Sequence, residues 1–299
     1  MRALIIVLAL PAAGQDRQTV THVFTPDGRR EAVSATRTAG GRTVEEVAGL
    51  NGRPVAVETA EEKVIEDAGG RKVIERTIRR DGAPAERVRV ETESLPGGGT
   101  VSRTTVYRAD LNGRLAPAER TVSESRPEGA ATATATRVER PGLNGGFELV
   151  ERRERQSREL AGGARETAET VYRRDASGRF SEAARQVQRQ TKEGDAVVER
   201  TEEFENASTG RMQLSRQTVA RSVKDADGER RVVDVYGPAA PGRAAEGALQ
   251  LRERQVVERR EEASGHTETF SIQRPTVDDA RRLGPLVRIS ETVCRGKCN

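Results

Sequence analysis

Large apolar residues recur along this chain at fixed distances from a series of turn glycines. Between them, charged residues alternate with Thr, Ser or Ala, as in the stretch Glu166 to Thr170. Alternation with a period of two, together with enrichment in Thr, Val and Tyr, predicts β-strands. One column is aromatic and stands six positions before a turn glycine, at Tyr107, Tyr172, Phe204 and Tyr236. Another is apolar and stands two positions after a turn glycine, at Leu115, Phe147, Phe180 and Met212. Two further columns hold valines, at Val106, Val138, Val171, Val235 and at Val122, Val187, Val219. Stacked side by side, such columns would form a narrow apolar stripe near one end of the strands.

The turn glycines form two interleaved series. Many follow Asn or Asp, a pairing that tolerates the positive φ of tight hairpin turns. The first series is Gly28, Gly52, Gly82, Gly113, Gly145, Gly178, Gly210 and Gly242, and the second includes Gly40, Gly69, Gly97, Gly129, Gly162, Gly194, Gly228 and Gly265. A fixed period of roughly 32 residues is typical of a repeat protein. We therefore expect an all-β fold, an elongated antiparallel β-meander of about eight hairpin repeats with about 14 to 17 strands, built as a single-layer or rolled sheet.

The ends of the chain differ from the repeats. Residues 1–14 have a basic Arg2, the apolar run Ala3 to Leu10 and a small-residue cleavage site, which is typical of a signal peptide. The alternative is an apolar N-terminal strand. Residues 15–274 are expected to form the β-hairpin repeat domain, and residues 275–299 a C-terminal cap that ends the pairing edge. Together these features predict a secreted or periplasmic protein.

Charge is abundant but balanced, with 51 Lys and Arg residues against 47 Asp and Glu residues. Because the signs alternate along the strands, no basic patch for a nucleic acid is expected. Large apolar residues are scarce, so disorder is the competing interpretation. The same scarcity argues against an outer-membrane barrel, whose strands need an uninterrupted apolar band facing lipid. The sequence thus predicts a chain that does not span a membrane.

Two segments resemble a known repeat. Tyr107 to Leu115 reads YRADLNGRL and Tyr172 to Phe180 reads YRRDASGRF. Both are similar to the YD repeats of Rhs-type secreted proteins, which place Tyr and Asp ahead of Gly-Arg and an apolar residue. The resemblance implies β-hairpins in an exported protein. Family repeats are shorter and usually place Tyr and Asp together, and the toxin that such shells enclose is not implied here.

Reactive side chains are few. His22 and His266 have no nucleophile motif around them, and no catalytic, cofactor-binding or metal site is expected. Cys294 and Cys298 are close enough to form a small disulfide loop in an oxidising compartment, with free thiols as the alternative.

The absence of a catalytic motif favours a non-enzymatic envelope or extracellular repeat protein with a structural or binding role. Its partner would be a protein or a polysaccharide of the cell envelope. The alternative is an envelope enzyme or carrier whose site forms only if the sheet rolls up around a cavity.

Overall fold

A computed structural model describes residues 16–25, 28, 30–48, 54–175, 177–206, 211–238, 249–276 and 282–296. Within them the chain is entirely β apart from one 3-10 turn, Ala161–Gly163. The expected signal peptide at residues 1–14 lies outside the described residues. The strands are β1 Arg17–Phe24, β2 Arg30–Ala39, β3 Arg42–Ala48, β4 Pro54–Ala68, β5 Arg71–Arg80, β6 Ala83–Ser94, β7 Thr100–Ala109, β8 Leu115–Glu128, β9 Ala131–Pro141, β10 Phe147–Glu159, β11 Arg165–Arg174, β12 Phe180–Glu193, β13 Ala196–Asn206, β14 Met212–Lys224, β15 Gly228–Gly237, β16 Gln250–Glu262, β17 Gly265–Gln273 and β18 Val287–Gly296.

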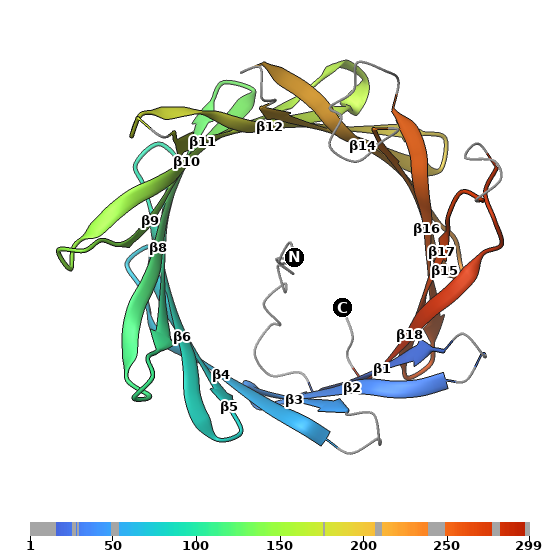
Figure 1. Cartoon of the computed structure of the whole chain (residues 1–299), viewed down its shortest axis with the longest axis horizontal. Helices are drawn as coiled ribbons and strands as arrows, with labels where there is room; N and C mark the ends of the chain where they lie inside the picture. Colours follow the sequence, from blue (N-terminus) through green and yellow to red (C-terminus); the bar gives the residue numbers. More distant parts are fainter. Residues whose placement is uncertain are drawn as a thin grey trace.

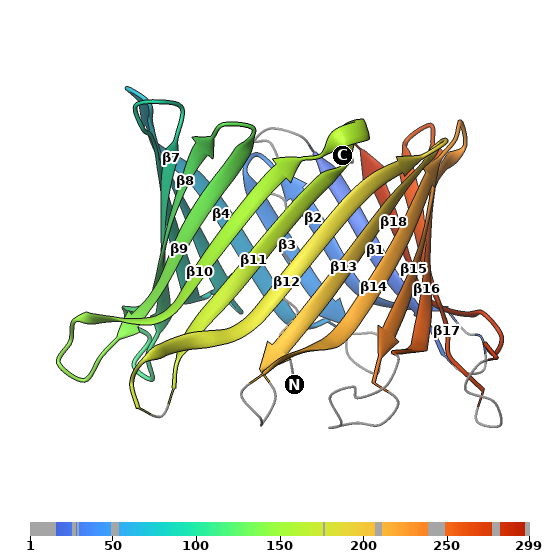
Figure 2. The same ribbon diagram turned by 90° about the horizontal axis from the view of Figure 1, so that it is seen from above.

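Each strand pairs antiparallel with the next, and the last strand pairs with the first. The predicted all-β antiparallel fold is therefore confirmed. The prediction of an open or merely rolled sheet of eight repeats is wrong, because the 18 strands close into a barrel (Figures 1 and 2). The scarcity of apolar residues did not exclude a barrel, because closure depends on backbone pairing between the two ends of the chain, which no local pattern reveals.

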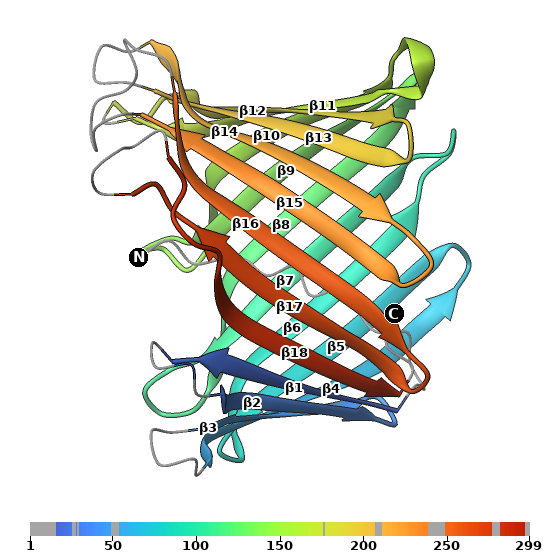
Figure 3. The same ribbon diagram turned by 90° about the vertical axis from the view of Figure 1, so that its right-hand side faces the viewer.

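The described members of the two glycine series lie at the two rims of the barrel. We call the rim with the β1–β2, β15–β16 and β17–β18 connections the long-loop rim, and the opposite one the short-turn rim (Figure 3). Gly113 and Gly178 belong to the long-loop rim, and Gly129 and Gly194 to the short-turn rim. All four have positive φ, as the turn prediction requires.

The two segments that resemble YD repeats form the turns between β7 and β8 and between β11 and β12. Asp110 Oδ1 accepts hydrogen bonds from the N–H groups of Asn112 (2.8 Å) and Arg114 (2.9 Å). Asp175 makes the same contacts with Ser177 and Arg179, and the Ser177 hydroxyl also donates to it. The hydrogen bonds from Ser177 and Arg179 hold the pKa of the Asp175 carboxyl below its usual range. The Asp-x-x-Gly-Arg spacing is thus explained by turn geometry, and the family resemblance itself stays a prediction.

Side chains alternate between the two sides of the wall. In the even-numbered strands, the residues of one face form their backbone hydrogen bonds with the preceding strand. The N–H of Ser94 donates to the carbonyl oxygen of Gly70, and the N–H of Glu62 donates to that of Gly41. The chirality of L-amino acids then decides which face points inward. When a strand runs upward and a side chain points at the viewer, the N–H and C=O groups of that residue point to the right. Seen from outside, however, the even strands run upward with their preceding strand on the left (Figure 2). Ser94 and Glu62 therefore point into the barrel. We call their face the inner face and the opposite one the outer face.

The apolar columns divide between these faces. The aromatic column and the Val122 column lie on the outer face, whereas the Val106 column lies on the inner face. The expected single apolar stripe is therefore wrong, because the period of two places neighbouring columns on opposite sides of one layer. No second layer covers the sheet among the described residues, so buried side chains such as Val73 and Val256 are isolated. On the outer face, long Arg and Glu side chains cover such valines with their aliphatic stems.

The C-terminal segment closes the barrel. β18 pairs with β17 on one side and with β1 on the other. The edge that residues 275–299 were expected to cap therefore does not exist in the described part of the chain. Cys294 is buried in β18 directly opposite Thr19. Cys298 lies outside the described residues, so the Cys294–Cys298 disulfide stays a prediction.

Strands β15 and β16 approach each other closely at Gly228, and this gives a stability prediction. A Cβ there would overlap the carbonyl oxygen of Arg259 on β16. Replacing Gly228 by Ala should lower the free energy of unfolding by roughly 2 kcal/mol or more, because the two backbones must separate. Urea unfolding followed by far-UV circular dichroism measures this. The control is Gly146→Ala, since a Cβ at Gly146 meets nothing within 4 Å. Equal stability of the two variants would contradict the described register.

Candidate functional site: the barrel lumen

The 18 strands form a closed ring, and no described strand lies inside it (Figure 1). We call the space within the ring the lumen. With strands ~4.8 Å apart and tilted by ~40°, 18 strands place opposing backbones roughly 36 Å apart. A barrel of this strand number is too wide for its own side chains to fill and leaves an aqueous channel. The inner face is therefore the surface that a solute inside the barrel would meet.

Hydroxyl groups on the inner face bond to one another across neighbouring strands. Ser123 and Thr136 lie 2.9 Å apart, and Ser157 and Thr167 lie 2.9 Å apart. Similar pairs join other strands, at Thr21–Thr292, Thr38–Thr43 and Thr134–Ser125. Each hydroxyl offers one donor and two acceptors, so a mutual hydrogen bond leaves acceptor capacity for water or a solute. The inner wall is hydrophilic without depending on charge at these positions.

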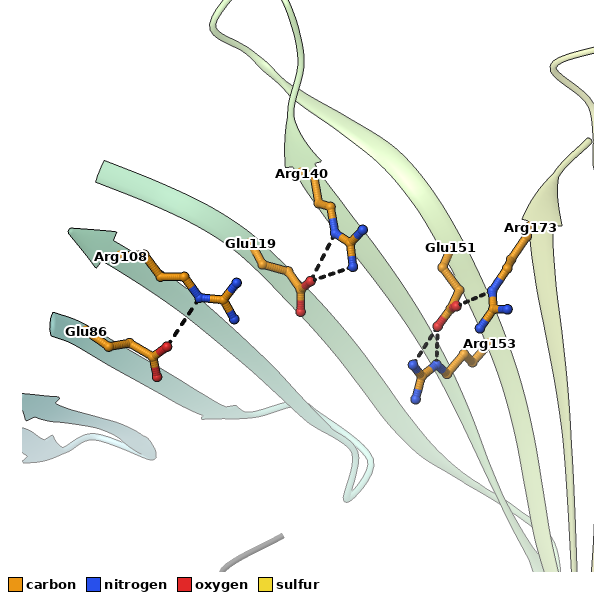
Figure 4. Close-up of polar contacts among 7 residues, drawn as sticks. All are labelled: Glu86, Arg108, Glu119, Arg140, Glu151, Arg153 and Arg173. Atoms are coloured by element: carbon orange, nitrogen blue, oxygen red, sulfur yellow. Dashed lines mark hydrogen bonds and ion pairs between the residues drawn. The ribbon is translucent and has the colours of Figure 1, made fainter. Parts of the chain in front are cut away.

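A row of ion pairs follows the inner face near the long-loop rim. Arg108 Nε lies 3.3 Å from Glu86, Arg140 Nε 3.1 Å from Glu119, and Arg173 Nε 2.7 Å from Glu151 (Figure 4). Glu151 also accepts a hydrogen bond from Arg153 (2.6 Å). The series begins with Glu58 and Arg80 at 3.0 Å. We call these residues the rim ladder.

The rim ladder joins strands that have no turn at that rim. Its pairs connect β4 with β5, β6 with β7, β8 with β9, and β10 with β11, whose turns all lie at the short-turn rim. Each pair therefore holds successive hairpins together where the chain does not. Exposed ion pairs contribute at most about 1 kcal/mol each, but Glu151 is 9% exposed and has two arginine partners. Glu151 is therefore the strongest member of the row.

Aromatic side chains form a belt on the outer face near the same rim. The belt holds all three tyrosines and four of the five phenylalanines: Phe24, Tyr107, Phe147, Tyr172, Phe180, Phe204 and Tyr236. Arginines stack on five of these rings, with Arg87 4.4 Å from the centre of Tyr107 and Arg152 4.6 Å from that of Tyr172. We call this set the outer belt. Aromatic rings with a polar edge suit a boundary between an apolar and an aqueous medium.

Below the outer belt, the outer face carries paired charges. Glu166 accepts hydrogen bonds from Arg158 (2.7 Å) and Arg189 (2.6 Å). Asp234 receives two from Arg254, at 2.6 and 2.8 Å. Among the described residues, the outer face therefore lacks the continuous apolar band on which the argument against a membrane barrel was based. Pairing lowers the cost of moving such charges out of water without removing it.

The two histidines and Cys294 do not assemble into a reactive site. Closure brings β1, β17 and β18 together, so His22 and His266 lie two strands apart. They are on opposite faces, however, and toward opposite rims. His266 stands opposite Cys294 on the inner face. No three His, Cys, Asp or Glu residues of the described chain are arranged to hold a metal ion.

Sequence reasoning gave an enclosed cavity only as an alternative, and it missed the hydroxyl pairs and the rim ladder. The ladder had a detectable signal, since its Glu and Arg members recur with nearly the period of the glycines. Assigning them to one face required the strand register. No helix of the described chain is long and apolar enough to cross a membrane.

The rim ladder gives a stability prediction. Glu151→Gln should lower the free energy of unfolding by about 2 kcal/mol, because two arginines lose a buried charged acceptor. Glu86→Gln, with one partner and a more exposed side chain, should cost less than about 1 kcal/mol. Urea unfolding at low salt compares the two. A larger loss for Glu86→Gln would contradict the ranking.

Comparisons with known proteins identify the fold. No protein-family model matches the chain, and no curated protein matches it. Among solved structures, an engineered mutant of the Rh. blastica porin matches with a TM-score of 0.54 and 11% identity, covering 94% of this chain and 98% of that one. A Rhodopseudomonas blastica porin triple mutant matches with a TM-score of 0.54, 10% identity and the same coverage. The closed barrel, its sequential strand order and these likenesses show that the chain has a porin-like β-barrel fold.

Proposed function

We propose that this protein is a non-enzymatic channel of the outer membrane, whose lumen conducts small hydrophilic solutes. This replaces both functions expected from the sequence, a structural or binding repeat protein and an enzyme or carrier in a rolled sheet. The likeness to porins overturns both, and with them the expectation that the chain does not span a membrane. The observation that carries the proposal is the closed 18-stranded wall around a hydroxyl-lined lumen.

Two further features support a membrane location. Closure satisfies the backbone hydrogen bonds of the strands within the wall, which a lipid environment requires. The outer belt gathers nearly all the aromatic rings of the chain near one rim, where an interface between lipid and water would lie. Arginines stacked on these rings are in position to reach anionic headgroups. The charges below the belt occur in pairs, which lowers their cost in lipid.

Channel activity is tested in planar lipid bilayers. The refolded chain should produce stepwise conductance in KCl, because no strand of the described residues crosses the lumen (Figure 1). A variant truncated before Val287 is the matched control, since without β18 the strand β1 has only one neighbour. The truncated chain should give no stable steps. Absence of conductance from the full chain would refute the proposed function.

Membrane attachment is tested separately through the outer belt. Replacing Tyr107, Tyr172 and Tyr236 by Ser should weaken partitioning into liposomes by roughly fivefold per ring, equivalent to ~1 kcal/mol each. The control is Phe270→Ser, which removes a ring from the inner face. Co-flotation with liposomes measures the partitioning. Recovery of the unaltered chain in the aqueous fraction, or equal losses for both variants, would contradict a lipid-facing belt.

A further inference from the structure

On β6 to β9 the inner wall carries no charge over much of its height. Between the rim ladder and the short-turn rim, the inner-face residues of β6 to β9 are Thr, Ser and Val, with a single proline. They are Val88, Val90, Thr92 and Ser94 on β6, Thr100, Ser102, Thr104 and Val106 on β7, Thr121, Ser123, Ser125 and Pro127 on β8, and Thr132, Thr134, Thr136 and Val138 on β9. We call this the hydroxyl sector.

The strand register arranges these hydroxyls in rows that cross the four strands. One row runs Thr92–Ser102–Ser123–Thr136, and the next runs Ser94–Thr100–Ser125–Thr134. Neighbours within a row are ~4.8 Å apart and the rows are ~6.8 Å apart, as antiparallel pairing dictates. The result is a regular grid of hydroxyl groups on the luminal side of the wall.

Charge returns at both borders of the sector. On β5, Lys72 and Arg76 stand opposite Thr92 and Val88. On β10, Arg153 and Arg155 stand opposite Thr136 and Thr134. The contrast is sharpest within the same four strands, whose outer face carries many charges, such as the pair Arg120–Glu139 at 2.6 Å. In these four strands the absence of charge is therefore a property of the inner face and not of the strands as a whole.

We propose that the hydroxyl sector is a contact surface for neutral polyhydroxylated solutes, the chemical class of oligosaccharides, as they pass through the lumen. This inference rests on the proposed channel. A hydroxyl-lined wall offers donors and acceptors that match sugar hydroxyls one for one. It supplies no opposite charge to compensate an ion for lost hydration, so ions gain little from it. Ions are expected to follow the charged arc of the wall instead.

The test compares saccharide and ion passage in three forms of the full chain. Thr92, Thr134 and Thr136 are replaced by Val, which keeps the side-chain shape and removes three hydroxyls from the grid. Maltohexaose entry into liposomes should fall roughly threefold or more, as expected for the loss of several modest hydrogen bonds. KCl conductance in bilayers should stay within about twofold of the unaltered chain.

The matched control replaces Thr77, Thr105 and Thr170 by Val, three threonines of the outer face. This variant makes the same chemical change on the same kind of strand and should leave maltohexaose entry unchanged. Equal loss in both variants, or unaltered entry in the inner variant, would overturn the proposal.

A second measurement separates this inference from the proposed channel. Equilibrium dialysis of the detergent-solubilised barrel against labelled maltohexaose needs no membrane. If the unaltered chain gives no conductance but binds maltohexaose, and only the inner variant loses that binding, then the channel proposal fails and the hydroxyl sector is still supported. If the unaltered chain neither passes nor binds maltohexaose, the hydroxyl-sector proposal is wrong.

Discussion

Closure of the hydrogen-bonded wall is the constraint on which the rest of this structure depends. A strand at the edge of a sheet exposes a row of unpaired N–H and C=O groups. Here β1 lies between β2 and β18, so the sheet has no edge and each strand has two neighbours. The lumen, the two rims and the separation into an inner and an outer face all follow from this single pairing between the ends of the chain.

Such a wall must be stable without a conventional core. Only isolated residues such as Val73, Val138 and Val256 are buried, and no second layer packs on the sheet in the described part of the chain. Backbone hydrogen bonds, cross-strand ion pairs and hydroxyl pairs must therefore supply much of what apolar packing supplies elsewhere. The abundance of Arg and Glu has a structural explanation: their long side chains pair across strands and cover the small apolar residues between them.

The two faces differ in which of these interactions they contain. In β6 to β9 the inner face is uncharged between the rim ladder and the short-turn rim, whereas the outer face of the same strands carries Arg–Glu pairs beneath the aromatic belt. This arrangement differs from that of typical outer-membrane barrels, which have an apolar band outside and a polar interior. The fold is therefore the feature shared with the porins, and the surface chemistry is particular to this chain.

The sequence by itself determined the local structure. Turn glycines such as Gly113 and Gly178, the Asp-x-x-Gly turns at Asp110 and Asp175, and the period-two alternation were sufficient to predict antiparallel hairpins, because turns and strand propensity depend on neighbouring residues. Only the tertiary structure decided that β18 pairs with β1, which face Tyr172 and Val171 occupy, and that Glu151 lies beside Arg173. A contact between residues nearly 280 positions apart leaves no periodic trace in the sequence, and a one-residue change of register would exchange the two faces.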